Sequence, residues 1–170
     1  MLKAVYLWHP IFVHFSVALL TVATGFYVLA TLFKKNRLQP QWLTVAHWNF
    51  GVGLAMTVLT LLFGWLAFNT VSHDAAAHDA IAIHRNLALV TASGFGLLGL
   101  AARWHRASPH YPTWWFTALL VLCFGLLMVT GLRGGELVYH YGLAVQSIPK
   151  PAKSTNGVPH LDHGQESHAD

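Results

Sequence analysis

Four long, nearly uncharged apolar runs constrain this chain more than any other feature of its sequence. They cover residues 10–33, 42–67, 80–102 and 113–133. Each run is close to the ~20 residues that an α-helix needs to cross the apolar core of a membrane. Only 9% of the 170 residues are charged, whereas a soluble domain carries about 25% charged residues. The sequence therefore predicts an integral membrane protein.

The connections between the runs predict how these helices are arranged. Helices joined by short loops pack as antiparallel neighbours in an up-down bundle. We therefore expect an all-α membrane protein whose four-helix transmembrane domain spans residues 1–147. From residue 148 to residue 170 the chain is polar and rich in histidine, and we expect it to form a separate C-terminal tail.

Lysine and arginine are concentrated in two of the predicted loops. The loop after the first run holds Lys34, Lys35 and Arg37, and the loop after the third holds Arg103 and Arg106. Because cytoplasmic loops are enriched in these residues, both termini are expected on the opposite, outer side of the membrane. The net charge of +4 suits contact with anionic lipid. No basic face with interleaved aromatic residues indicates nucleic-acid binding.

Three of the predicted helices carry a histidine near their N-terminal end and a small residue four positions later. These pairs are His14–Ala18, His47–Gly51 and His84–Ala88. An imidazole inside an apolar span marks a functional site by default. A small residue four positions further on clears space on the same helix face, as a planar ligand would require.

These histidines are expected at two different depths in the membrane. The first and third helices of an up-down bundle run in the same direction, so His14 and His84 are expected at similar depth, with His47 in the opposite leaflet. Neighbouring helix axes lie 8–10 Å apart, which makes the diagonal roughly 11–14 Å. Two imidazoles on one haem iron need a Cα separation on the order of 13 Å. We therefore predict haem b with His14 and His84 as axial ligands and with Ala18 and Ala88 beside it.

The same residues leave other interpretations open. A copper or zinc ion could replace haem, with His47 or His140 as less favoured ligands. The histidines could instead form structural hydrogen bonds, and the small residues could serve helix packing alone. Arg85 and Arg133 are candidate partners of haem propionates or of lipid headgroups. His9, like His140, is expected at or outside the membrane surface.

No catalytic constellation is present in the sequence. Its serines are not set in a nucleophile elbow, and the single cysteine, Cys123, excludes both an internal disulfide and a C-x-x-C-H haem attachment. The sequence therefore favours an electron-transfer component over a stand-alone enzyme. The expected partners are membrane lipid and either other membrane redox subunits or an external electron carrier.

Two segments resemble an uncharacterised bacterial membrane-protein family known as domain of unknown function 2231. Residues 9–15, His-Pro-Ile-Phe-Val-His-Phe, are similar to its H-P-x-x-V-H-F opening, and residues 134–142 are similar to its G-G-E-L-V-Y-x-x-G motif. His84 matches its third-helix histidine, while Ser16 stands where proline is expected. The resemblance implies a bacterial membrane protein. With the orientation expected from the charged loops, it would lie in the inner membrane with both termini in the periplasm. Relatives fused to Rieske-type domains imply redox work.

Overall fold

The protein consists of four helices in the residues that the structure, a computed structural model, describes. These residues are 8–70, 75–105, 112–140 and 142. The helices are α1 (Trp8–Leu32), α2 (Gln39–Thr70), α3 (Ala75–His105) and α4 (Trp114–Tyr139). All four are long and apolar enough to cross a membrane, which confirms the predicted four-helix transmembrane fold. The predicted tail, residues 148–170, lies outside the described residues.

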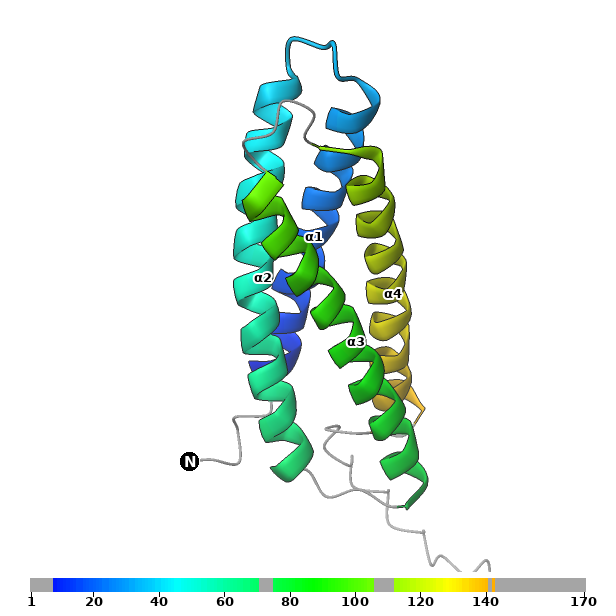
Figure 1. The fold of residues 1–170 in the computed structure, drawn as a ribbon. Coiled ribbons are helices and arrows are strands. Elements are labelled where there is room, and N and C mark those ends of the chain that lie inside the picture. Colours follow the sequence, from blue (N-terminus) through cyan, green and yellow to red (C-terminus); the bar gives the residue numbers. More distant parts are fainter. Residues whose placement is uncertain (1–7, 71–74, 106–111, 141, 143–170) are drawn as a thin grey trace, which may run out of the picture.

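The helices alternate in direction and close into a ring in chain order (Figure 1). Helix α1 packs against α2 and α4, and α3 packs against the same two helices, so α1 and α3 are diagonal partners. The most extensive contacts are those of α1 with α2 and of α3 with α4. The bundle is therefore two helical hairpins, which we call the first half (α1–α2) and the second half (α3–α4).

The helices extend beyond the apolar runs that predicted them. Helix α3 begins at Ala75 instead of residue 80, and α4 continues to Tyr139 instead of ending at residue 133. The adjacent glycines Gly134 and Gly135 do not end α4, although each costs about 1 kcal/mol relative to alanine in a helix interior. His140 caps the C-terminal end of α4, and its backbone N–H donates to the Glu136 carbonyl at 2.8 Å.

The starts of the helices follow from local chemistry. Pro10 lies in the first turn of α1 and Pro40 in the first turn of α2, where a missing N–H leaves no helical hydrogen bond unmade. Thr113 caps α4, and its side-chain oxygen accepts a hydrogen bond from the Phe116 N–H at 3.3 Å. Such a cap satisfies one of the N–H groups that the first turn of a helix leaves unpaired.

The two halves bury corresponding positions. Helix α1 buries residues 16, 20, 23 and 27, and α3 buries residues 75 positions later, at 91, 95, 98 and 102. Helix α2 buries residues 46, 50 and 53, and α4 buries residues 70 positions later, at 116, 120 and 123. Parallel repeats of this kind are related by an axis along the membrane normal. The bundle therefore has approximate two-fold symmetry about its long axis.

Candidate functional site

Two imidazoles, one from each half, lie partly buried at the end of the bundle where α1 and α3 begin. His9 is the second residue of α1, and His84 lies further along the diagonal helix α3. Helices α2 and α3 extend past the start of α1 at this end (Figure 1). We call His9 and His84 the histidine pair.

The ring of His9 is held by α2. Its Nδ1–H donates to the Thr60 carbonyl oxygen at 3.0 Å. Because a carbonyl only accepts, the hydrogen must be on Nδ1, and a neutral ring then carries its lone pair on Nε2. The ring also lies against Gly64, where a Cβ atom would come within 2.9 Å of His9 Cε1. Glycine at this position makes room for the imidazole.

The ring of His84 is held by α4 in the corresponding way. It hydrogen-bonds to the Thr130 carbonyl, and its Nδ1 is buried without a hydrogen-bond partner among the described residues. Nε2 is therefore the donor, and Nδ1 carries the lone pair of a neutral ring. A Cβ atom on Gly134 would lie 3.1 Å from His84 Cε1. Histidine, threonine carbonyl and glycine thus recur in both halves.

Hydroxyl pairs fix the helices behind each histidine. Seven residues after His9, Ser16 Oγ lies 2.9 Å from Thr60 Oγ1. Seven residues after His84, Thr91 Oγ1 lies 3.0 Å from Thr130 Oγ1. An interhelical hydrogen bond in a membrane contributes about 0.6 kcal/mol on average and up to about 1.7 kcal/mol. Each threonine therefore holds the histidine through its carbonyl and the facing helix through its hydroxyl.

The structure does not bring His14 together with His84. The His14 side chain is exposed, and its Nδ1–H donates to the Pro10 carbonyl of its own helix at 2.6 Å. Ala18 lies on the same exposed face. Because five residues turn a helix by about 140° at 3.6 residues per turn, His9 and His14 cannot both face the bundle. The histidine of α1 that contacts another helix is His9, which the sequence had placed at or outside the surface.

Of the remaining predicted residues of the site, Arg85 and Ala88 follow His84 in the sequence, and Arg133 precedes Gly134. Ala88 is half-buried, one turn after His84. The guanidinium carbon of Arg85 lies 5.3 Å from the ring centroid of Phe68 on α2. Arg133 pairs with Glu136 at 2.8 Å, and both side chains are about half exposed. Such exposed pairs contribute about 0–1 kcal/mol, so an anionic group could displace Glu136 at little cost.

The other candidate metal ligands lie apart from the pair. His47 is near the start of α2, at the opposite end of the bundle, where its Nδ1–H donates to the Leu43 carbonyl at 2.5 Å. Its ring meets the buried Tyr27 ring edge-on at 5.6 Å between centroids. His140 is exposed at the end of α4. In the part of the chain that the structure describes, no three His, Cys, Asp or Glu side chains converge as a metal site.

No polar pattern in the sequence distinguishes His9 from His14. His9 and Ser16 are seven residues apart, and so are His84 and Thr91, so each pair shares one helix face over two turns. His14 and Thr21 have the same spacing, and both are exposed. In a membrane, apolar side chains face lipid as readily as they face other helices, so neither signal identifies the inward face of α1.

Taken together, these observations define a multi-pass membrane protein with a histidine pair built symmetrically from its two halves. The sequence profile of a family described as "Predicted membrane protein (DUF2231)" matches residues 8–147. The chain belongs to this family, which confirms the resemblance found in its motifs. No curated protein matches the chain significantly, and neither does any solved structure.

Proposed function

We propose that this protein is a membrane-bound b-type haem protein in electron transfer, with His9 and His84 as the axial ligands. One observation carries the proposal: each half presents one imidazole with one nitrogen bonded to a threonine carbonyl and the other carrying the lone pair. Histidines that bind metals usually donate their second ring N–H to a carbonyl or carboxylate, which fixes the tautomer and the ring orientation. A bound haem would supply one-electron redox chemistry.

The arrangement of the helices suits a flat group between the halves. His9 and His84 come from diagonal helices, and each of the two interfaces between the halves, α1–α4 and α2–α3, is less extensive than the interface within either half. Separation at this boundary would therefore disturb the fewest packed side chains. His9 offers Nε2 and His84 offers Nδ1, and a half-turn of the His84 ring exchanges its two nitrogens.

Charged residues near the histidine pair would orient such a group. Arg85 follows His84 directly, and Arg133 precedes Gly134. Both guanidinium groups are exposed and suit bidentate pairing with carboxylates. We propose that they contact the propionates, while Ala88 leaves space next to His84.

The proposed location is the bacterial inner membrane with both termini in the periplasm. Among the described residues, Lys34, Lys35, Arg37 and Arg103 all lie at the end opposite the histidine pair. Because cytoplasmic ends of helices are enriched in lysine and arginine, the histidine pair would lie near the outer face. There it could exchange electrons with other membrane redox subunits or with an external electron carrier.

The test is an optical spectrum of the full chain purified from haem-replete cells, recorded for the wild type and three variants. We expect a bis-histidine α-band in the reduced-minus-oxidised spectrum. His9→Ala and His84→Ala should each lower haem per polypeptide by at least the roughly 10-fold that loss of an outer-shell partner costs. His14→Ala is the matched control on the same helix and should retain the spectrum.

Each contrary result has a distinct meaning. A wild type without an α-band overturns the haem proposal as a whole. Loss of the band in His14→Ala, with retention in His9→Ala, restores the pair predicted from sequence and rejects the pair proposed from geometry. Circular dichroism of each variant distinguishes loss of haem from loss of fold.

A structural role is the second candidate, because each histidine also ties two helices together. His9 links α1 to α2, and His84 links α3 to α4. This role predicts a colourless protein in which His9→Asn, which keeps an N–H donor, is more stable than His9→Ala. A haem protein would instead lose its spectrum in both variants.

A further inference from the structure

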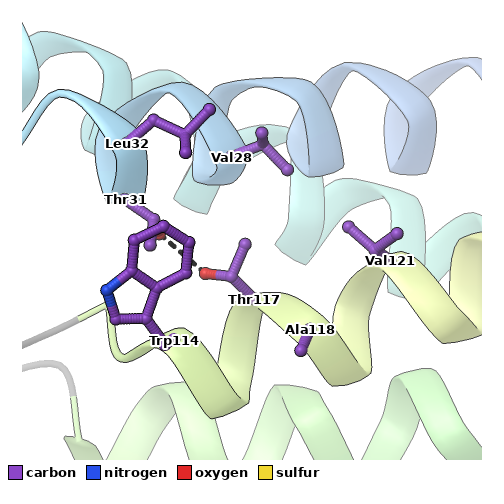
Figure 2. Close-up of a pocket in the computed structure, with 7 residues that line it drawn as sticks. All are labelled: Val28, Thr31, Leu32, Trp114, Thr117, Ala118 and Val121. Carbon is purple, nitrogen blue, oxygen red and sulfur yellow. Dashed lines mark hydrogen bonds between the residues drawn. The ribbon is translucent and has the colours of Figure 1, made fainter.

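A groove between α1 and α4 opens at the end of the bundle opposite the histidine pair. Its volume is about 340 Å³, which is within the range of small-ligand sites. Figure 2 shows its lining, which comes from Val28, Thr31 and Leu32 of α1 and from Trp114, Ala118 and Val121 of α4. Because both helices span the membrane, the groove faces the lipid.

A ligand in the groove would contact hydrocarbon side chains, and no hydroxyl hydrogen would be available to it. Thr31 and the adjacent Thr117 are the hydroxyl residues in its lining, and their oxygens lie 2.7 Å apart (Figure 2). Thr31 donates its hydrogen to the Tyr27 carbonyl at 2.8 Å, so Thr117 must be the donor to Thr31. Both hydroxyl hydrogens are therefore committed within the protein, and the groove suits an alkyl chain better than a polar head.

Three exposed cations lie in the turn that follows α1. Leu32 lines the groove and is the last residue of α1, and the turn that follows carries Lys34, Lys35 and Arg37. The acidic side chains that the structure describes, Asp79 and Glu136, lie near the other end of the bundle. No described carboxylate therefore neutralises these cations.

We infer that this groove binds one phospholipid with an anionic headgroup. One acyl chain lies against the apolar lining, and the headgroup pairs with the cations of the turn. Lysine and arginine at a membrane surface attract anionic lipids, and Trp114, which is 60% exposed, is a residue type enriched at the membrane–water interface. This site is independent of the histidine pair and of any cofactor there.

Native mass spectrometry of the full chain in detergent tests the inference, with equal amounts of phosphatidylglycerol and phosphatidylcholine as the probes. The wild type should retain about ten times more phosphatidylglycerol than phosphatidylcholine, since three cations act on one headgroup. The triple variant Lys34→Gln, Lys35→Gln, Arg37→Gln should bring the ratio close to one. Arg133→Gln removes a cation at the opposite end and should leave the preference intact.

A second pair of variants tests the groove itself. Val121→Trp fills the groove and should lower retention of both lipids, whereas Leu122→Trp, at the next position and outside the lining, should not. Equal retention of the two lipids by the wild type overturns the inference, and so does equal behaviour of Val121→Trp and Leu122→Trp. Circular dichroism establishes that each variant keeps its helices.

Discussion

The first and second halves of the bundle differ in their packing residues but agree in the residues that hold the histidines. In both halves, a histidine bonds to a threonine carbonyl and lies over a glycine on the neighbouring helix. In both, a hydroxyl seven residues later pairs with that threonine. The two hairpins therefore support one imidazole each in the same way.

The glycine at the close packing contact lies on different helices in the two halves. In the first half the glycine is on the second helix, where a Cβ on Gly53 would lie 3.0 Å from Leu20 Cδ2. In the second half it is on the first helix, where a Cβ on Gly94 would lie 2.9 Å from Cys123 Sγ. In both halves the close contact therefore involves one glycine, but the glycine lies on a different helix in each half.

Truncation of the corresponding core residues Leu20 and Phe95 should give the largest effects. Both are fully buried, and Leu20→Ala should lower the free energy of unfolding by about 2–5 kcal/mol and Phe95→Ala by about 3–5 kcal/mol. Equilibrium unfolding in mixed micelles, followed by circular dichroism, measures both. A single transition in each variant is expected for one shared core. Two separate transitions would show that the halves unfold independently.

Adding a methyl group at either packing glycine should have an intermediate effect. Gly53→Ala and Gly94→Ala should each cost about 1–3 kcal/mol, because extra atoms in a packed interior force side chains to shift. Adding Cys123→Ala to Gly94→Ala removes the sulfur atom 2.9 Å from the new methyl group and should recover part of the loss. The same Cys123→Ala change should not rescue Gly53→Ala. If Cys123→Ala restored stability to both glycine variants, its effect would not come from the contact with Gly94 alone.

Removing the hydroxyl pairs should have the smallest effect. Ser16→Ala and Thr91→Val should each lower the free energy of unfolding by about 0.6–1.7 kcal/mol, the range of interhelical hydrogen bonds in membranes. Thr21→Val is the control, since the Thr21 hydroxyl is exposed and donates to the Val17 carbonyl of its own helix at 2.7 Å. Unequal losses at Ser16 and Thr91, measured in the same micelles, would mean that the two hydroxyl pairs are not equivalent.

The number and order of the helices were predictable because long apolar runs leave few alternatives in a membrane. Their bounds were not, since the helices continue into polar sequence on both sides of the apolar runs. The first turn of α3 is one example, and the Gly134-Gly135 step of α4 is another. At these positions, the extent of the helix is determined by packing against neighbouring helices and by the need to pair backbone N–H and C=O groups.

Of the two histidines that we propose as ligands, the sequence indicated one. His84 lies deep inside an apolar run, whereas His9 precedes the run that begins at Pro10 and was assigned to the surface. His14, which lies inside the run, was predicted as the ligand instead. Apolar content does not distinguish the lipid-facing side of a helix from its buried side. The rotation of α1 was therefore not visible in the pattern of apolar residues.

The close pairing within each hairpin also bears on how the chain enters the membrane. The best window of α3 has a mean hydropathy of 1.4, the lowest of the four helices, and that of α4 has 2.2, the highest. Helix α3 also carries Arg85 and Asp79, which raise the cost of inserting it alone. Because α3 packs extensively against α4, we expect these two helices to leave the translocation machinery together. The most apolar membrane segment would then assist the insertion of the least apolar one.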